Sequence, residues 1–568
     1  MKPGLGAGPS GRNHMFNCRS LPISTGHNYH KGVVAGLSWP SWPYLLSSGR
    51  AALSLRVHRR VPEIGEGEFM MRRPAMVTAA AVLCAAFVTS AGAAADAGTP
   101  ANAAVGRTWG TAAEVPGTAA LNKSGQAGVG ALSCAASGDC SAGGSYASGP
   151  GVGGPTLQAY VVSETHGTWG TAKEVPGTAA LNAGGNAKVL AISCATAGNC
   201  LAGGYYTQGA SGLRQAFVAT ETGGTWATAV EAPGTATLNQ GHPGAAVTSV
   251  SCTAAGDCVA GGRYTDASGK TQAFIATQTS GTWGKAEEVP GTAALNHGGY
   301  ALANSVSCAS TGNCSVGGRY ASSNNDGVVI AQAYVLSETN GTWGTAEEVP
   351  GTAALNGGGY AEVDSVSCGS AGNCSAGGAY TTSTPVTEAF VVNETNGTWG
   401  TAEEVPGTAA LNTNGLAQVN SVSCAAPGDC SAGGLYLDAA FNQGAFIVNE
   451  TNGTWGAAEE VPGIAALNQG SPGATVASVS CAGPLICSAG GFYSDSGNNH
   501  QAFVVNERNG IWRTAEEVPG TASLNAGGLA GIGVLSCPTS GLGLCSAGGS
   551  YTDASLHTQA FTVNESSG

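Results

Sequence analysis

One unit of sequence recurs eight times along most of this 568-residue chain. Each copy has a tryptophan within a variant of GTWGTAEEVPGTAALN, followed by a variant of SVSC, a short turn, CSAGGxY and QAFVVNET. Successive tryptophans lie 56 to 60 residues apart, which is typical of repeat architectures, so the fold must be built from one small unit multiplied. The tryptophans are Trp109, Trp169, Trp226, Trp283, Trp343, Trp399, Trp455 and Trp512.

The composition favours an all-β unit. The chain has 91 glycines, and charged residues make up only 10% of it, which argues against a charged disordered chain and against a helix-rich enzyme. Pro-Gly and Asn-Gly pairs recur at regular intervals between runs of Val, Thr, Ser and Ala. Such spacing predicts many short strands joined by turns.

The unit that begins at Ala417 illustrates the expected blade. Its first two strands form a hairpin that carries a cysteine pair, and its last two turn at Asn452-Gly453, a strong signal for a two-residue turn. Four antiparallel strands followed by a long return describe a β-propeller blade. The predicted strands and the return are Ala417–Cys424, Cys430–Tyr436, Ala445–Glu450, Thr454–Val461 and Pro462–Asn468.

The two ends of the repeat region predict a closed ring. The region begins at Thr108-Trp109, which corresponds to the fourth strand of a blade whose first three strands do not precede it. It ends at Gln559–Glu565, which corresponds to the third strand of a blade whose fourth strand does not follow it. An open array would need atypical polar repeats at its ends, and neither end has one. We therefore expect an eight-bladed β-propeller over residues 107–568, closed by pairing of its N-terminal strand with the C-terminal blade, with an open array as the alternative.

Sixteen cysteines form eight close pairs, once Cys18 and Cys84 are set aside. Even numbers at fixed spacing in an exported chain predict disulfides, and an antiparallel hairpin brings facing residues within bonding range. Zinc is disfavoured, because five residues separate most pairs and no histidine recurs beside them. In one hairpin we expect Ala425 to pair with Asp429 around a three-residue loop. The predicted bridges are Cys134/Cys140, Cys194/Cys200, Cys252/Cys258, Cys308/Cys314, Cys368/Cys374, Cys424/Cys430, Cys481/Cys487 and Cys537/Cys545.

The segment before the repeats predicts export. A basic Met71-Arg72-Arg73, an apolar run and small residues near Ala93 make residues 70–95 a secretory signal peptide, with a short linker at 96–106. The apolar run is too short for a stable membrane span. Residues 1–69 are interpreted as upstream message translated in error or, alternatively, as a disordered extension.

The charge of the remaining chain excludes a nucleic-acid partner. Ten of the 21 basic and three of the 35 acidic residues lie in residues 1–95, which leaves 11 basic and 32 acidic residues after them. Such a chain repels nucleic acid and anionic membranes. We expect a secreted monomer without a cofactor.

The repeat motif SVSCxxxGxCSAGGxY with QAFVVNETNGTWG resembles a largely uncharacterised family of secreted repeat proteins from high-GC Gram-positive bacteria. The resemblance covers roughly Arg107 to Gly568 and implies export and a propeller fold rather than an activity. SETHGTW, from Ser163 to Trp169, is similar in shape to the Asp-box turn SxDxGxTW of sialidase-type propellers. It has Glu164 in place of aspartate and is one residue shorter, and an Asp-box is itself a structural turn.

Catalysis finds little support in the sequence. No GxSxG, HExxH or phosphate-binding loop occurs, and a glutamate repeated in every unit serves the blade rather than one active site. Sialidase-like chemistry would need clustered arginines and a tyrosine, and no pattern connects the arginines of separate units. These arginines are Arg214, Arg263, Arg319, Arg508 and Arg513. A propeller glycosidase or polysaccharide lyase remains an alternative, because carboxylates of different blades can converge.

A binding or scaffold role is the main expectation. The loops between second and third strands vary among the units while the opposite turns do not, and variable loops on a constant scaffold often carry recognition. Tyr300 and Tyr360 precede first strands of adjacent units, with His297 and His242 nearby, so we expect these four residues at a ligand site on the channel rim. The ligand classes considered are a carbohydrate, a cell-wall polymer and a protein; a purely structural surface protein is the other alternative.

Overall fold

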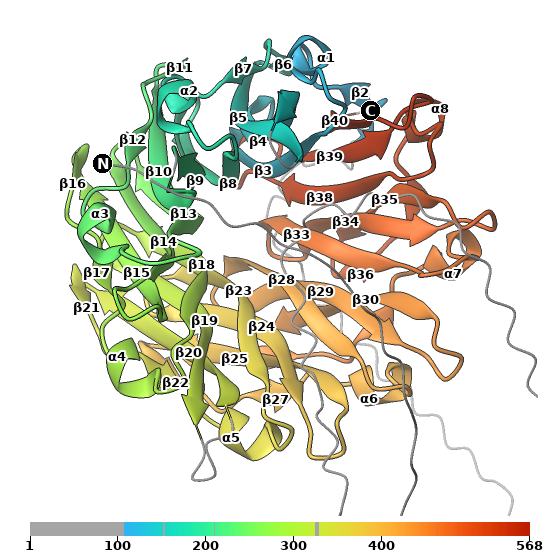
Figure 1. The fold of residues 1–568 in the computed structure, drawn as a ribbon. Helices are drawn as coiled ribbons and strands as arrows, with labels where there is room; N and C mark the ends of the chain where they lie inside the picture. Colours follow the sequence, from blue (N-terminus) through green and yellow to red (C-terminus); the bar gives the residue numbers. More distant parts are fainter. Residues whose placement is uncertain (1–106, 152–153, 210, 324–328, 568) are drawn as a thin grey trace, which may run out of the picture. The chain divides into compact units, whose positions relative to one another are not determined.

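The computed structural model describes residues 107–151, 154–209, 211–323 and 329–567, which form eight sheets arranged in a ring (Figure 1). The predicted eight-bladed all-β propeller is confirmed. The first strand of each blade lies nearest the channel and contacts the first strands of its neighbours. These first strands are β3 (Ala127–Ala136), β8 (Lys188–Thr196), β13 (Ala246–Ala254), β18 (Ala301–Ser310), β23 (Ala361–Ser370), β28 (Ala417–Ala426), β33 (Thr475–Gly483) and β38 (Gly531–Ser536).

The second and third strands continue each blade outward by antiparallel pairing. The second strands are β4 (Asp139–Gly151), β9 (Asn199–Gln208), β14 (Asp257–Thr265), β19 (Asn313–Ser323), β24 (Asn373–Thr381), β29 (Asp429–Leu437), β34 (Ile486–Ser494) and β39 (Ser546–Thr552). The third strands are β5 (Gly154–Thr165), β10 (Leu213–Thr222), β15 (Thr271–Thr279), β20 (Val329–Thr339), β25 (Thr387–Thr395), β30 (Gln443–Thr451), β35 (His500–Arg508) and β40 (Thr558–Ser567).

The fourth strand is interrupted, which corrects the continuous strand predicted for Thr454–Val461. Both of its pieces pair with the third strand, and between them the N–H of Ala458 donates to the carbonyl of Pro406 in the preceding blade, 2.6 Å away. The first pieces are β6 (Thr168–Trp169), β11 (Thr225–Trp226), β16 (Thr282–Trp283), β21 (Thr342–Trp343), β26 (Thr398–Trp399), β31 (Thr454–Trp455), β36 (Ile511–Trp512) and β1 (Arg107–Trp109). The second pieces are β7 (Lys173–Glu174), β12 (Val230–Glu231), β17 (Glu287–Glu288), β22 (Glu347–Glu348), β27 (Glu403–Glu404), β32 (Glu459–Glu460), β37 (Glu516–Glu517) and β2 (Ala113–Glu114).

A four-residue helix follows in each return, where the sequence predicted a long connection without naming a helix. Its N-cap glycine has a left-handed backbone, as at Gly463 with φ 82°. The helices are α1 (Thr118–Leu121), α2 (Thr178–Leu181), α3 (Thr235–Leu238), α4 (Thr292–Leu295), α5 (Thr352–Leu355), α6 (Thr408–Leu411), α7 (Ile464–Leu467) and α8 (Thr521–Leu524).

The eight cysteine pairs are bonded as predicted, with Cα atoms 3.9–4.1 Å apart. The predicted pairing of Ala425 with Asp429 is wrong. Instead Ala426 pairs with Asp429, Ala425 forms a bulge, and the turn has two residues, with Gly428 left-handed at φ 72°. The bridges join Cys134 with Cys140, Cys194 with Cys200, Cys252 with Cys258, Cys308 with Cys314, Cys368 with Cys374, Cys424 with Cys430, Cys481 with Cys487, and Cys537 with Cys545.

The second cysteine of each bridge is buried between blades, which the sequence did not predict. The hydroxyl of Ser315 lies 3.3 Å from the Cys374 sulfur in the next blade, and Ser431 lies equally close to the Cys487 sulfur. These sulfur atoms pack in the core, so the bridges stabilise the contact between blades. The exposed fraction is only 2% for Cys140, 3% for Cys314, and 4% for both Cys374 and Cys487.

Opposite loops define two faces of the ring. On one face, which we call the disulfide face, the disulfide hairpins contact the Asn-Gly turns: the N–H of Gly453 donates to the carbonyl of Gly428. On the other, which we call the helix face, the returns with their short helices contact the loops between second and third strands, as when Gly241 donates to Thr265. This arrangement was predicted.

The core lies between neighbouring blades. Side chains of a third strand alternate between two faces, so Phe446 and Val448 pack toward the preceding blade while Ala445 and Ile447 pack toward the next. Every blade therefore buries both of its faces. This explains why the third strands read as unbroken apolar runs.

A buried polar link joins most neighbouring blades. Trp455 Nε1 donates to Asn393 Oδ1 of the preceding blade at 3.0 Å, and Asn393 Nδ2 donates to Glu450 at 2.5 Å. Ser375, also in the preceding blade, donates to the other Glu450 oxygen at 3.1 Å. The tryptophan that marks each repeat is thus an inter-blade contact.

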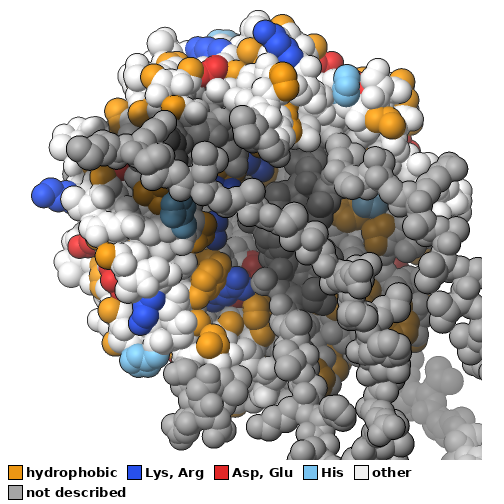
Figure 2. Space-filling model, in the orientation of Figure 1, with side chains coloured by type: hydrophobic (Ala, Val, Ile, Leu, Met, Phe, Trp, Pro, Cys, Tyr) orange, Lys and Arg blue, Asp and Glu red, His pale blue; other side chains and the backbone are white. Residues whose placement is uncertain are grey.

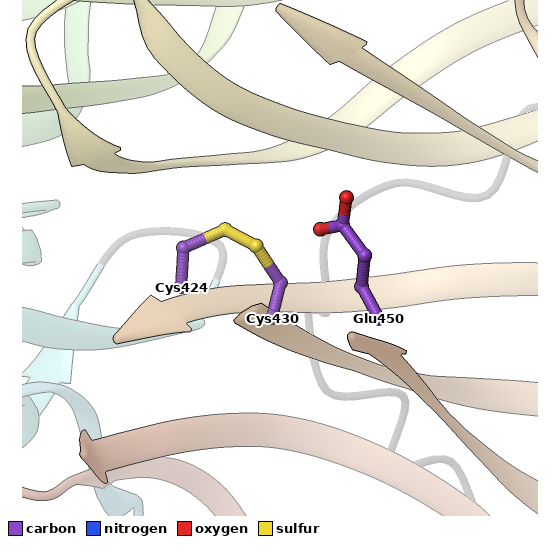
Figure 3. A group of neighbouring side chains, drawn as sticks. All are labelled: Cys424, Cys430 and Glu450. Carbon is purple, nitrogen blue, oxygen red and sulfur yellow. A yellow bond between two sulfur atoms is a disulfide. The ribbon is translucent and has the colours of Figure 1, made fainter. Parts of the chain in front are cut away.

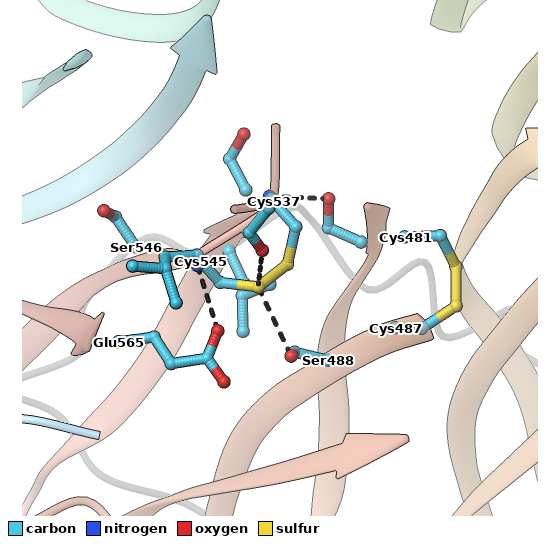
Figure 4. The surroundings of a disulfide bond; sticks show 12 residues. Cys481, Cys487, Ser488, Cys537, Cys545, Ser546 and Glu565 are labelled. Carbon is cyan, nitrogen blue, oxygen red and sulfur yellow. Dashed lines mark hydrogen bonds between the residues drawn. A yellow bond between two sulfur atoms is a disulfide. The ribbon is translucent and has the colours of Figure 1, made fainter. Parts of the chain in front are cut away.

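The ring closes through the two ends of the repeat region, as predicted. β1 pairs with β40, with Trp109 opposite Glu565. The last disulfide, Cys537–Cys545, lies beside this joint, where the Cys545 N–H donates to Glu565 (Figure 4). Ser488 of the preceding blade lies 3.3 Å from the Cys545 sulfur.

The predicted upstream segment 1–69, signal peptide 70–95 and linker 96–106 lie outside the described residues. Among the residues that the structure does describe, no helix is long and apolar enough to span a membrane.

Candidate functional site

Two positions at the inner edge of each blade, near the helix face, differ strongly among the units. One lies on the first strand, and its partner follows the Gly-Gly of the second strand; we call them rim pairs. In a repeat, residues shared by all units build the blade, so the residues that differ are candidates for function. The rim pairs are Gly128–Ser145, Lys188–Tyr205, Ala246–Arg263, Leu302–Arg319, Glu362–Ala379, Gln418–Leu435, Thr475–Phe492 and Gly531–Ser550.

The Gly-Gly pair sets the geometry of the rim. A Cβ at Gly378 would overlap the carbonyl oxygen of Glu362, so only glycine allows β23 and β24 to approach this closely. A register shift follows between Val363 and Ser365, which makes Asp364 the bulged residue. Glu362 and Asp364 are thereby held at the inner edge of their blade.

Arg319 joins two adjacent blades at the rim. Its guanidinium carbon lies 5.0 Å from the ring centre of Tyr300 and 5.5 Å from that of Tyr360. Nη1 donates to the Tyr360 hydroxyl at 2.8 Å and lies 3.1 Å from a Glu362 carboxylate oxygen. We call Tyr300, Arg319, Tyr360, Glu362 and Asp364 the rim cluster.

The returns position both tyrosines. Asn296 Oδ1 accepts the N–H of Tyr300, and Asn356 Oδ1 accepts that of Tyr360, each at 2.6 Å. These asparagines follow α4 and α5, and their side-chain amides also bind the neighbouring third strands. A structural asparagine of the repeat therefore fixes the backbone from which each ring projects.

The electrostatics of the rim cluster favour protonated groups beside Arg319. Tyr360 donates to Glu362, and burial together with that carboxylate raises the Tyr360 pKa. Burial, and then the charge of Glu362, raises the pKa of Asp364, although Gln418 donates to it at 3.0 Å. Asp364 keeps some solvent contact but is surrounded by protein. Arg319 and Glu362 form the ion pair of the cluster.

The structure brings together only part of the site expected from the sequence. Tyr300 and Tyr360 meet through Arg319, whereas His242 and His297 are exposed on their return loops. No hydrogen bond, ion pair or ring contact connects either histidine with the rim cluster in the part of the chain that the structure describes. The sequence analysis named Arg319 only among arginines without a common pattern, and it did not single out Glu362. The signal was the position after Gly-Gly, which is arginine in two consecutive units.

A group of two cysteines and a glutamate on the disulfide face has the composition of a metal site, but its members form a disulfide and a contact between blades. The sulfur atoms of Cys424 and Cys430 and a carboxylate oxygen of Glu450 lie within 4.8 Å of one another (Figure 3). The two sulfurs are joined to each other, so they offer no thiolates to a metal ion. Glu450 belongs to the polar link between blades.

A hollow of about 370 Å³ on the disulfide face marks a defect in the repeat. It lies between the second and third blades and is lined by Thr220 and Gln278, which occupy the positions of Asn393 and Glu394. Gln278 Oε1 is buried and has no hydrogen-bond partner among the described residues. The polar link is absent at this interface.

Comparison with known proteins finds only distant structural similarity. No family model and no curated protein matches the chain. Sqt1 from Chaetomium thermophilum, solved bound to the N-terminus of ribosomal protein L10, is 9% identical, with a TM-score of 0.43 over 78% of this chain and 98% of that one. A subtype N11 neuraminidase-like protein of A/flat-faced bat/Peru/033/2010 is 11% identical, with a TM-score of 0.32 over 82% and 94%. The α-L-arabinofuranosidase PaAbf62A from Podospora anserina is 8% identical, with a TM-score of 0.22 over 45% and 87%.

Proposed function

We propose that the protein is an extracellular binding module that holds its ligand at the helix-face rim of the channel. The observation that carries this proposal is the rim cluster, where the otherwise regular repeat changes. Blade 1 has Gly128 and Ser145 at its rim pair and still forms the same four strands. The larger and charged rim residues of other blades are therefore not needed to build a blade.

Two features of the chain support an extracellular setting. Eight disulfides are typical of proteins from oxidising compartments. The predicted signal peptide leads to the same compartment. The chemistry of the rim cluster supports the binding role. Tyr300 and Tyr360 are half-buried and lie beside Arg319, and partly exposed tyrosine rings next to a cation are suited to binding sugars or peptides.

Retention on an array of glycans and cell-wall polymers tests the proposal. The full chain is compared with a double variant, Tyr300→Ala with Tyr360→Ala, and with the control His557→Ala, an exposed residue of another helix-face loop. We expect the double variant to lose at least about tenfold in affinity, since each ring and its cation contribute roughly 1 kcal/mol. Its melting temperature should change little.

Two results would contradict this binding role. If the double variant were retained as well as the wild type, binding would not depend on the tyrosines of the rim cluster. A large loss of stability in the double variant, absent in His557→Ala, would show that the two rings serve the core.

Glycoside hydrolysis is the second candidate, and one observation favours it. Tyr360 donates to Glu362 while Arg319 contacts both, an arrangement in which a carboxylate could accept a proton from a tyrosine nucleophile. The raised pKa of Asp364 favours its protonated form, which a general acid requires. The raised pKa of Tyr360 opposes the nucleophile role in the free protein. Turnover of a glycoside panel that is lost in Asp364→Asn, with binding kept, would favour the enzyme.

A further inference from the structure

Basic side chains are concentrated at one part of the rim. After residue 95 the chain has only 11 basic residues. Three consecutive blades carry four of them near the rim pairs, whereas the rim pairs of the other five blades have none. We call these four residues the basic arc: Lys188, Arg214, Arg263 and Arg319.

Positional equivalence places the basic arc at one level of the ring. Tyr205, Arg263 and Arg319 each follow the Gly-Gly of a second strand, in β9, β14 and β19, so the repeat puts them at the same height and radius. Lys188 pairs with Tyr205 across the first two strands of its blade. In Figure 2, Lys and Arg side chains gather along the inner side of the blades that contain β8, β13 and β18.

Arginines of two adjacent blades lie close enough to Tyr205 for their charges to act on it. The guanidinium carbon of Arg214 lies 4.6 Å from the Tyr205 ring centre. Burial raises the pKa of the Tyr205 hydroxyl, and the charges of both Arg214 and Arg263 oppose that shift. Both guanidinium groups therefore act on one side chain, although they belong to adjacent blades.

Three of the four charges are uncompensated. Arg319 pairs with Glu362, but Lys188, Arg214 and Arg263 form no ion pair within the described ranges of the chain. All three are only partly exposed, and burial lowers the pKa of Lys188. Partly desolvated cations without a partner carry a free-energy cost that a bound anion would remove.

We propose that the basic arc binds the acidic groups of an anionic polysaccharide. This inference rests on the proposed binding function and specifies its ligand class. Guanidinium groups bind carboxylate and phosphate through paired hydrogen bonds, so the acidic group is either of these. Tyr205 and Tyr300 beside the cations provide aromatic surface for sugar rings. A nucleic acid would need a far larger basic surface than four residues of an acidic protein.

Binding of defined polymers to the full chain tests the inference by titration calorimetry. The probes are oligomers of polygalacturonate, the same oligomers with their carboxyl groups reduced to alcohols, poly(glycerol phosphate) and polyglutamate. Lys188→Gln with Arg263→Gln is the test variant. Lys173→Gln with Lys285→Gln is the matched control, because it removes two exposed lysines outside the arc.

We expect the wild type to bind polygalacturonate or poly(glycerol phosphate), which identifies carboxylate or phosphate as the acidic group. The test variant should bind at least about tenfold more weakly, since it removes two cations that would form charge-assisted hydrogen bonds with the acidic groups. The control variant should bind as the wild type does. Raising the salt concentration from 50 to 500 mM should weaken binding by about tenfold or more.

Other outcomes overturn the inference. Equal affinity for the reduced oligomers, or equal affinity of the test variant, would show that the basic arc does not select acidic groups. The proposed function would survive that result if binding still required Tyr300 and Tyr360. Binding of polyglutamate in preference to both sugar polymers would replace the polysaccharide by an acidic protein. Binding that is independent of both the arc and the two tyrosines would refute the proposed function as well.

Discussion

Arg107 Nη1 lies 3.6 Å from the carboxylate of Glu565, a residue 458 positions later in the chain. The same arginine donates to the carbonyls of Leu542 and Gly543, at 2.6 and 2.9 Å. Arg508 of the seventh blade binds the other Glu565 oxygen at 3.3 Å. One buried carboxylate thus connects the first strand of the region, the last strand and the loop before β39.

Replacing Arg107 should weaken ring closure. We expect Arg107→Ala to lower the free energy of unfolding by about 2–4 kcal/mol, because it leaves the buried Glu565 with one cation and removes two hydrogen bonds. Chemical denaturation measures the change. Arg513→Ala, which removes an exposed arginine, is the control and should change stability by less than about 0.5 kcal/mol. Equal effects of the two substitutions would contradict the role assigned to the joint.

Deleting the closing strand should be more damaging than trimming the predicted linker. Loss of residues 107–115 exposes the edge of β40 and invites aggregation through edge pairing. Loss of residues 96–105 leaves the whole β1–β40 ladder in place. Light scattering during heating compares the two proteins, and similar aggregation temperatures would argue against closure by β1.

The missing polar link between the second and third blades can be restored. In Thr220→Asn, the new amide can donate to the unpartnered Gln278 Oε1 and its oxygen can accept from Trp283, as Asn393 does for Glu450 and Trp455. We expect a gain of about 1–2 kcal/mol, seen as a higher denaturation midpoint. Thr222→Asn, an exposed change two residues away, should give none. An unchanged or lower midpoint in Thr220→Asn would show that the link adds no stability.

Phe441 is strained as well as exposed. Its φ is 63°, its side chain is 71% exposed, and the same turn position holds Gly269 and Asn498 in other blades. Phe441→Asn should raise stability by about 0.5–1 kcal/mol, because asparagine tolerates the left-handed region better. Phe441→Ala keeps a Cβ in that region and should gain much less. Thermal melts of both variants make the comparison, and an equal gain would point to removal of the apolar ring instead.

Stability should fall as the pH rises above neutrality. Burial raises the pKa of Glu164 and Glu507 to about 7, from an ordinary value of 4.5. The folded state therefore holds these protons more tightly, so their contribution is intact below pH 4.5 and is lost as pH rises through 7. We expect the loss to be about 1–3 kcal/mol in total between pH 5 and pH 8.

Glu507→Gln tests the cause of this pH dependence, because Gln278 already fills the equivalent position in the third blade. The variant should lose less stability than the wild type between pH 5 and pH 8, while the exposed control Glu516→Gln should follow the wild type. Calorimetric melts of the three proteins at pH 5 and pH 8 measure these losses of stability. A pH dependence that is unchanged in Glu507→Gln would place its origin elsewhere.

Local patterns were sufficient for most of the fold. The Asn452-Gly453 turn and the Cys424–Cys430 pair each depend on residues within one hairpin, so the sequence predicts them well. The break in the fourth strand was missed, because it depends on a hydrogen bond from Ala458 to Pro406 of another blade. The two-residue turn was missed because a bulge at Ala425 shifts the register, and bulges have weak sequence signals.

The rim cluster could be predicted only in part, because its contacts also join residues of different blades. Tyr300 and Tyr360 were identified by their places in the repeat. Arg319 was considered and set aside, because arginines of separate units showed no common pattern. The pattern appears only when Tyr205, Arg263 and Arg319 are aligned on the Gly-Gly of the second strand. The contact of Arg319 with Tyr360 depends on how neighbouring blades pack.

The separation between Gly-Gly backbone and rim side chain has an evolutionary consequence. Since the close approach of β18 to β19 depends on Gly318 and not on the neighbouring Arg319, which is only partly buried, a mutation at the latter position can change chemistry at the channel while the two strands keep their pairing. Each duplication of the unit would then add one more rim pair to an unchanged frame. A ring of this kind can acquire new specificities one blade at a time, while the remaining blades preserve its closure.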